Sequence, residues 1–458
     1  MRASSPEEKE WYTWFISGFF FPFHERIKNH DSVAVRKELE ISQWWDPKRL
    51  ETLQLSKLRR LLGHAEIHVP YYRALFSDIS FNPEEVRSLT DLAYLPLLDK
   101  SRIRANTEAL KSENGQSLDR FNTGGSSGEP LIFYIGKERV SHDVAAKWRA
   151  TRWWNVDIGD REIVVWGSPI ELGAQDGIRG IRDWLLRTKL LPAFEMSEQK
   201  LDRFLDEIRA VRPKMLFGYP SALSHIARHA NARGQRMDNL GLRVAFVTSE
   251  RLYDEQRGQI SKTFGCPVAN GYGGRDAGFI AHECPEGGMH ITAEDIIVEI
   301  VDQQGMPLPC GEAGEIVVTH LATKDFPFIR YRTGDIGVLD SKLCTCGRGL
   351  PLLKEIQGRS TDFLVAQDGT VIHGLALIYI LRDVTGISNF KIIQESLNLT
   401  RISVVLDSKL GPETIAKIEQ GFKARLGQTV NIVIEEVAEI PPEKSGKFRY
   451  VVSKVATV

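Results

Sequence analysis

A run of glycines and hydroxyl side chains, the Gly/Ser loop Thr123-Gly124-Gly125-Ser126-Ser127-Gly128, is the part of the sequence best suited to binding an anion. Glycines let backbone N–H groups approach phosphate oxygens, and hydroxyls add further donors. Glu129 stands where a Walker A loop carries its lysine, and a strand-like segment follows in place of the helix of a dinucleotide fingerprint. Alone, the run predicts either an unusual phosphate loop or an ordinary flexible turn.

Three cysteines and one histidine form a second set of chemically suitable residues: Cys284, His290, Cys344 and Cys346. Three thiolates and an imidazole suit tetrahedral zinc, and four protein ligands would close the site to water, which predicts a structural role. Two alternatives stay open: His282 replaces His290, or the four residues are unrelated and the paired cysteines only form a turn. Cys266 and Cys310 lack ligand-like neighbours and are interpreted as packing or surface thiols.

Four other segments combine glycine with tyrosine, arginine, carboxylate or lysine side chains: Gly271 to Asp276, Tyr331 to Asp335, Gly358 to Asp362 and Pro442 to Arg449. In this order after the Gly/Ser loop, they make the chain resemble the adenylate-forming superfamily of acyl-CoA ligases from about Leu58 to the C-terminus. Within it, the chain is similar to the phenylacetate-CoA ligase branch, including relatives linked to capsular polysaccharide synthesis. The resemblance implies ATP, Mg²⁺, coenzyme A and a carboxylic acid as ligands.

The resemblance also implies how the nucleotide is bound. The Gly/Ser loop would hold the ATP phosphates, Tyr272 would stack on adenine beside Gly273, and Asp276 would bind Mg²⁺. The family usually places glutamate at the position of Asp276, so this shorter side chain is expected to reach the metal through water. Tyr272 is also compatible with simple core packing, which is the commoner fate of its residue type.

The later segments complete the implied site. Asp335 would accept hydrogen bonds from the ribose hydroxyls, although a turn carboxylate that caps its own backbone is the plainer alternative. Arg359 would lie near the ribose, and Thr361 and Asp362 would form the pivot of a hinge. Lys447 would enter the active site as the catalytic lysine. Similar cysteine and histidine positions occur in some phenylacetate-CoA ligase relatives, which agrees with the zinc hypothesis.

Composition limits the partners. Lys plus Arg number 59 against 60 for Asp plus Glu, so no basic field favours nucleic acid. The apolar stretch from Trp14 to Phe23 is too short to span a bilayer, and we expect it to be a docking helix and no stable membrane insertion. Five cysteines in 458 residues form no disulfide framework, which favours a reducing cytoplasm. A homodimer is compatible with the sequence.

Short apolar runs lie in the middle of the chain, for example Ile163 to Trp166, Met215 to Phe217 and Val244 to Val247. Helical patterns separate these runs. This alternation predicts an α/β fold with mixed, largely parallel sheets. Two β-rich runs, Ile296 to Val301 and Glu315 to Thr319, predict an antiparallel, β-rich subdomain. Strand and helix patterns after the hinge predict a small, mobile α+β domain. The expected organisation is an adenylation domain at 1–357, a hinge at 358–362 and a lid domain at 363–458.

Three hypotheses about function follow. The first is an AMP-forming ligase that adenylates a carboxylic acid and transfers the acyl group to coenzyme A. The second is an adenylating enzyme that passes the acyl group to an amine or hydroxyl, as in polysaccharide decoration. The third is a nucleotide-binding homologue without catalysis, supported only by the Asp276 departure. The acid is not readable, although Trp166, Phe217, Tyr219 and Gly273 are candidate pocket residues.

Overall fold

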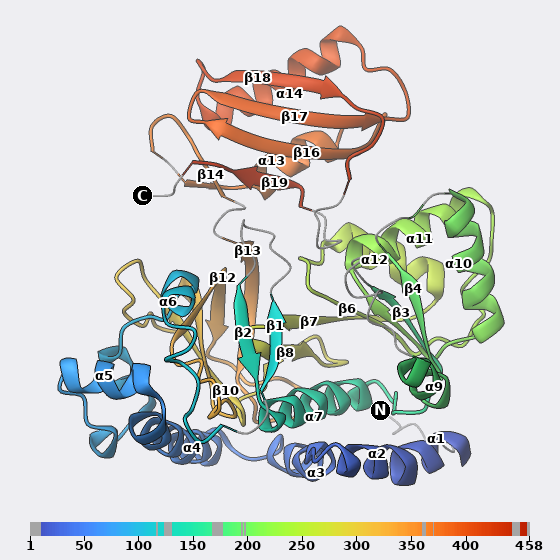
Figure 1. Ribbon diagram of the computed structural model, residues 1–458. Helices are drawn as coiled ribbons and strands as arrows, with labels where there is room; N and C mark the ends of the chain where they lie inside the picture. The colour runs from blue at the N-terminus through green and yellow to red at the C-terminus, as the bar shows by residue number, and fades with distance from the viewer. Residues whose placement is uncertain are drawn as a thin grey trace. The chain divides into compact units, whose positions relative to one another are not determined.

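The computed structural model describes residues 11–115, 118–122, 131–166, 177–193, 196, 198–359, 363–369, 371–441 and 449–455. The chain divides into two compact units (Figure 1). The first comprises Met1–Thr333 with Gly337–Ile356, and the second comprises Gly334–Ile336 with Gln357–Val458.

Half of the main sheet of the first unit is parallel. Its strands occur in the order β4-β3-β5-β6-β7, with bounds β3 (Glu162–Trp166), β4 (Thr188–Pro192), β5 (Met215–Gly218), β6 (Val244–Thr248) and β7 (Val268–Gly274). Both β5 and β6 are buried throughout, as expected for parallel strands covered on both faces. Leu216 packs into one core and its neighbour Phe217 into the other. The predicted parallel sheet is confirmed.

Helices cover this parallel half. They are α9 (Gly177–Leu185), α10 (Glu198–Val211), α11 (Pro220–Ala232) and α12 (Asp254–Phe264). Leu205, Ile226 and Ile260, from α10, α11 and α12, pack in the same core as Leu216 (Figure 1, green). The apolar faces of these helices therefore explain why the strands between them read as uninterrupted apolar runs.

The antiparallel half continues from β7 in the same sheet, where the sequence predicted a separate addition. Its order is β7-β8-β9-β13-β12-β11-β10, with bounds β8 (Gly278–Glu283), β9 (Met289–Ile291), β10 (Ile296–Val301), β11 (Ala313–His320), β12 (Tyr331–Asp340) and β13 (Leu352–Arg359). Ile296 pairs with His320 in the antiparallel register of β10 and β11, which confirms the predicted antiparallel pair. The described chain thus contains one eleven-stranded sheet in place of two.

The N-terminal part is helical, and the predicted docking helix at Trp14 to Phe23 lies within it. The helices are α1 (Trp11–Phe15), the π-helix η1 (Ile16–Phe20), α2 (Phe21–Ile27), α3 (Ser32–Ser42), α4 (Pro47–His68), α5 (Pro70–Asp78), the 3-10 turns η2 (Pro83–Glu85) and η3 (Leu89–Tyr94), and α6 (Lys100–Ala105). Helix α4 begins where the Asp46 carboxylate accepts a hydrogen bond from the Arg49 N–H, with Pro47 in the first turn. After it come the hairpin of β1 (Asp119–Asn122) and β2 (Ile132–Ile135) and the long helix α7 (Lys137–Trp153).

The second unit is a small α+β domain. Its elements are β14 (Phe363–Val365), β15 (Val371–His373), α13 (Leu375–Arg382), β16 (Ile387–Ser396), β17 (Leu399–Leu406), α14 (Pro412–Leu426), β18 (Asn431–Glu436) and β19 (Val451–Ser453). The order β18-β17-β16-β19 combines a central antiparallel hairpin with two parallel edge strands. Ile418, Phe422 and Leu426 on α14 are fully buried, at helical spacing.

Candidate functional site

The Gly/Ser loop connects the two strands of a hairpin. Asn122, the last residue of β1, pairs with Ile132 at the start of β2. Residues 123–130 between these strands lie outside the described chain, as do Thr361, Asp362 and Lys447. The described flanks therefore give the loop a fixed base, immediately before α7, and its predicted role stays a prediction.

Tyr272 lies at an irregular point near the end of β7. The register between β7 and β8 shifts between Tyr272 and Gly273, which is a β-bulge. A Cβ on Gly273 would lie 2.2 Å from the carbonyl oxygen of Gly278, so only glycine fits there. The half-buried Tyr272 places its hydroxyl 3.5 Å from Thr333 Oγ1 on β12. Next to the bulge, Tyr272 therefore connects the predicted segment Gly271 to Asp276 with the predicted segment Tyr331 to Asp335.

Asp276 is held by a tyrosine from the predicted ribose segment. The Tyr331 hydroxyl donates to Asp276 Oδ2 at 2.6 Å, and the Ala277 N–H donates to Asp276 Oδ1 at 3.1 Å. Tyr331 is fully buried, whereas Asp276 is half-buried. The buried tyrosine therefore fixes a carboxylate that still reaches solvent. Sequence reasoning missed this contact, because nothing in the spacing of two segments 55 residues apart indicates it.

Helix α7 also contacts the turn that carries Asp276. Arg139 is buried and its Nη2 donates to the Arg275 carbonyl oxygen at 2.9 Å. Its guanidinium also lies over the Phe328 ring and near Asp143. The helix that follows the Gly/Ser loop is thereby tied to the backbone beside Asp276.

The remaining predicted nucleotide ligands belong to the second unit. Asp335 lies on β12 within Gly334–Ile336, the stretch of that strand that clusters with the C-terminal unit. Arg359 is the last residue of β13. Gly358 before it has φ +96°, a left-handed conformation that side chains other than glycine rarely adopt. The predicted hinge therefore begins at a backbone position that favours glycine.

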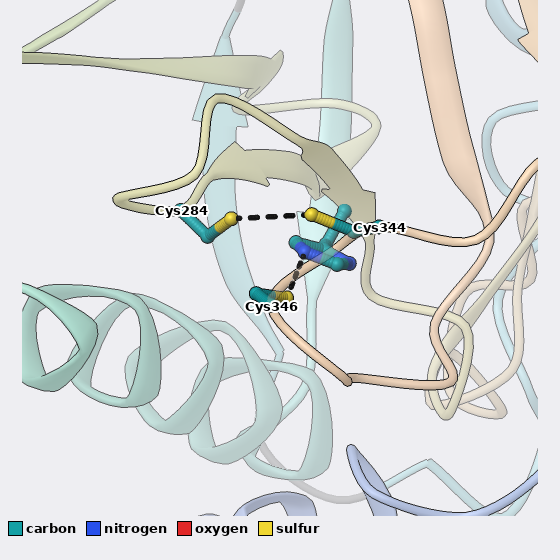
Figure 2. Close-up of side chains that lie close together, drawn as sticks. Cys284, Cys344 and Cys346 are labelled. Carbon is teal, nitrogen blue, oxygen red and sulfur yellow. Dashed lines mark hydrogen bonds between the residues drawn. The ribbon is translucent and has the colours of Figure 1, made fainter. Parts of the chain in front are cut away.

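The four predicted metal ligands converge. Their donor atoms all lie within 4.8 Å of one another, and they come from Cys284 after β8, His290 on β9, and Cys344 and Cys346 in the loop between β12 and β13. The sulfurs of Cys284 and Cys344 are 3.7 Å apart, and Cys346 Sγ lies 3.2 Å from His290 Nε2 (Figure 2). All five cysteines are free thiols. The first distance is far longer than a disulfide bond and close to the separation of about 3.8 Å expected for two thiolates on one tetrahedral zinc ion.

The surroundings of the cluster hold its ligands in place. Trp153 packs edge-on against the His290 ring, and Arg348 lies over the Trp153 indole. Burial, followed by the charge of Arg348, lowers the pKa of His290 to about 4, so its imidazole is neutral near pH 7. Burial raises the pKa of Cys346, but hydrogen bonds from the backbone and side chain of Arg348 help to reverse this, and the net shift is downward. The shifts of His290 and Cys346 therefore favour the protonation states that bind metal, whereas burial raises the pKa of Cys284 to about 12 and favours its thiol.

His282, the alternative ligand, lies elsewhere. Its ring stacks on Phe279 and packs near Phe246, and it is absent from the ligand cluster. Burial lowers the pKa of His282 to about 3, which keeps it neutral. Among the described residues, the geometry therefore favours His290 over His282.

Three of the four candidate pocket residues, all except Gly273, stack as aromatic rings. Trp166 stacks on Tyr219 with ring centroids 4.3 Å apart and on Phe217 at 5.8 Å. Phe217 in turn stacks on Phe246. Because Phe217 and Tyr219 are almost fully buried, these two rings act in the structure as core, and Trp166 is the more accessible of the three.

Two family descriptions match the chain: AMP-binding enzyme over residues 190–322, and CapK C-terminal domain over residues 364–454. Protein CapK of Staphylococcus aureus is 22% identical over 420 residues, covering 91% of this chain and 92% of that protein. A phenylacetate-coenzyme A ligase of Thermus thermophilus is 25% identical over 434 residues, covering 88% and 96%.

A solved structure shares the fold. The 2-hydroxyisobutyryl-CoA ligase, in its postadenylation state, superposes with a TM-score of 0.72 at 21% identity and covers 90% of both chains. The two family matches and the two relatives show that the chain belongs to the adenylate-forming superfamily, in the group that contains the phenylacetate-CoA ligases and CapK.

Proposed function

We propose that this protein is an ATP-dependent, AMP-forming ligase that adenylates a carboxylic acid and then transfers the acyl group to coenzyme A. The observation that carries the proposal is the contact between Tyr331 and Asp276, which brings together two segments that we assign to nucleotide binding from the sequence. Tyr272 and Thr333 meet beside them. Membership of the superfamily supports the same reaction.

In the first step, the substrate carboxylate oxygen attacks the α-phosphorus of ATP, and the bond to the β-phosphate oxygen breaks. The products are the acyl-adenylate and pyrophosphate. Negative charge builds on the phosphate oxygens, so positioned N–H groups and cations lower the barrier. We assign the phosphate contacts to the Gly/Ser loop and the bridging cation to Lys447. Tyr272 would bind adenine, and Asp335 and Arg359 would bind the ribose.

Asp276 is a suitable ligand for Mg²⁺. Each of its oxygens accepts one hydrogen bond from the protein, which leaves lone pairs for water or metal. Bound Mg²⁺ would neutralise phosphate charge. The fixed orientation of Asp276 supports this assignment despite its short side chain, and it weakens the hypothesis of a non-catalytic homologue.

We assign Zn²⁺ to the cluster of Cys284, His290, Cys344 and Cys346. The distances within the cluster and the four-ligand set support a closed, structural site. Such a site would join the hairpin of β8 and β9 to the loop before β13, and it would leave no open position for a reacting molecule.

In the second step, the thiolate of coenzyme A attacks the acyl carbon, and AMP leaves with the electrons of the cleaved bond. We propose that rotation about 358–362, with Thr361 and Asp362 as pivot, moves the lid domain 363–458 and withdraws Lys447 before this step. The left-handed Gly358 supports a pivot at this position. ATP, coenzyme A and free thiols all favour the cytoplasm as the location.

A second acceptor class has one observation in its favour. Residues 364–454 match the CapK C-terminal domain, whereas the family match in the first unit is the general AMP-binding one. By the resemblance, the lid domain would contact the acceptor in the second step, so a lid that matches its own family description supports an amine or hydroxyl acceptor as the alternative to coenzyme A.

Pyrophosphate release with a panel of carboxylic acids tests the first step. Phenylacetate and other aryl or short acyl acids should include at least one that gives acyl-adenylate and pyrophosphate in equal amounts. Product analysis with and without coenzyme A then separates the two acceptors. A thioester formed only with coenzyme A supports the first proposal, whereas adenylate that accumulates unchanged in its presence supports the second. No pyrophosphate release with any acid would contradict both.

A further inference from the structure

The N-terminal helix is continuous but carries its side chains in an unusual arrangement. Helix α1, the π-helix η1 and α2 run from Trp11 to Ile27, with right-handed helical geometry at the junctions. The π-turn spaces two buried residues, Ile16 and Phe21, five positions apart and so keeps one face turned inward. The residues on this inward face are Thr13, Ile16, Phe21 and Glu25.

The inward face docks the helix firmly. Ile16 packs directly against Gly159: a Cβ on Gly159 would lie only 2.7 Å from Ile16 Cβ. Phe21 packs edge-on against Trp148. Thr13 donates to Asp160 at 2.8 Å, and Glu25 accepts a hydrogen bond from the Ser32 hydroxyl. Two polar residues of the helix, Thr13 and Glu25, therefore point into the protein, and the helix cannot turn its other face inward without breaking these contacts.

The outward face is apolar and aromatic. Its exposed side chains are Trp11 (76%), Trp14 (57%), Phe15 (46%), Phe19 (56%), Phe23 (65%) and Ile27 (66%). They amount to roughly 700 Å² if each full side chain presents about 150–250 Å². This exceeds the largest apolar patch of a typical monomer, about 300–600 Å². A surface helix normally shows the opposite pattern, with its polar residues outside.

Helix α9 extends this surface. The Tyr12 hydroxyl donates to the Leu185 carbonyl oxygen at 2.9 Å, which places the C-terminal end of α9 beside α1 (Figure 1). On α9, Ile181 and Trp184 are 63% and 76% exposed. We call the outward residues of both helices the aromatic surface.

Cations border the aromatic surface. Arg26 and Lys28 are exposed, and neither has an ion pair within the described chain. Burial, and then the charges of Lys28 and Arg182, lower the pKa of His24, because both cations lie near it. The acidic group of this helix segment, Glu25, is turned inward. Tryptophan and phenylalanine beside exposed cations are the combination that binds a bilayer interface with anionic headgroups.

We propose that the aromatic surface docks the protein onto an anionic membrane, with the helix from Trp11 to Ile27 lying in the plane of the headgroups. No helix in the described chain is both long and apolar enough to cross a bilayer, which agrees with peripheral binding. A second copy of the chain could also cover an apolar face. However, the outward face of that copy's helix from Trp11 to Ile27 would offer no carboxylate to Arg26 and Lys28, because Glu25 is buried.

Flotation of the full-length protein with lipid vesicles tests the proposal. The wild type should float with phosphatidylcholine vesicles containing phosphatidylglycerol and bind pure phosphatidylcholine more weakly. The variant W14Q/F19Q/F23Q, which leaves the inward face intact, should lose at least about tenfold in bound fraction. The variant R26Q/K28Q should weaken binding only to the anionic vesicles.

The matched control is I67Q/M306Q, which removes two equally exposed apolar side chains from other parts of the chain. It should float like the wild type. Brominated lipids give a readout that needs no variant, because they should quench wild-type tryptophan fluorescence from Trp11, Trp14 and Trp184. Absence of flotation and of quenching would overturn the proposal. So would a dimer in sedimentation velocity that W14Q/F19Q/F23Q dissociates while vesicle binding is unaffected.

Discussion

Removing the Tyr331 hydroxyl tests whether the carboxylate it holds acts in adenylation. The substitution Tyr331→Phe deletes a 2.6 Å hydrogen bond from a fully buried phenol to Asp276. A hydrogen bond to a charged group contributes about 1.5–3 kcal/mol. Because Asp276 is half-buried, water can donate to it in the variant and compensate for part of the lost hydrogen bond. We therefore expect a loss of about 1.5–2 kcal/mol, or about 10- to 30-fold in the adenylation rate at limiting Mg²⁺.

The assay is ATP–pyrophosphate exchange measured across a range of Mg²⁺ concentrations. Tyr331→Phe should raise the Mg²⁺ concentration that gives half-maximal exchange, and excess Mg²⁺ should restore part of the rate. The matched control is Tyr72→Phe, which removes another buried phenol that donates to the Pro327 carbonyl oxygen at 3.3 Å. If both variants lose only thermal stability and keep wild-type Mg²⁺ dependence, the role of Asp276 is refuted.

Three further predictions concern metal binding, stability and pH. Cys344→Ser should reduce bound zinc from about one ion per chain to near zero and lower the melting temperature, measured by elemental analysis and calorimetry. Arg330→Met should lower the free energy of unfolding by about 3–5 kcal/mol in denaturant titrations, because it leaves the buried carboxylate of Glu299 without its partner. Burial alone would lower the pKa of His142, but Asp295 outweighs it and the net shift is upward. The destabilisation by His142→Asn should therefore be full below pH 6.5 and shrink as pH rises through the raised pKa.

Each of these has a matched control. Cys310→Ser changes an exposed cysteine outside the cluster and should leave zinc content unchanged. Arg236→Met breaks an exposed ion pair and should leave unfolding almost unaltered. His229→Asn removes a histidine whose partner, Asp202, is partly exposed, so at low pH it should destabilise the protein less than His142→Asn, whose partner Asp295 is buried. Equal zinc loss in both cysteine variants, equal destabilisation in both arginine variants, or a constant His142→Asn effect from pH 5 to 8 would contradict the respective argument.

The spacing of apolar residues predicted those helices and strands whose structure depends mainly on their own sequence. The helical patterns predicted between the apolar runs and after the hinge include Glu198 to Val211 and Pro412 to Leu426, which form α10 and α14. The sequence did not predict that the parallel and antiparallel strands form one sheet, because that depends on pairing between β7 and β8 and between β9 and β13. Nor did it predict the π-turn in the N-terminal helix, which follows from docking against the rest of the protein.

The candidate site divides in the same way. Residue type and spacing predicted the cysteine and histidine cluster, because the ligand chemistry is specific, and the geometry then favoured His290 over His282. The contact between Tyr331 and Asp276 was not predictable, since it requires a bulge at Gly273 and the packing of β12. The aromatic surface was also missed. An apolar stretch in the sequence predicts burial, and only the structure shows which side faces outward.

The most direct test of adenylation by this chain is ATP–pyrophosphate exchange by Lys447→Ala, with Lys444→Ala as the control from the same segment. The account predicts that Lys447→Ala abolishes exchange but largely retains thioester formation from supplied acyl-adenylate and coenzyme A, whereas Lys444→Ala behaves like the wild type. Exchange at the wild-type rate in Lys447→Ala would contradict the account.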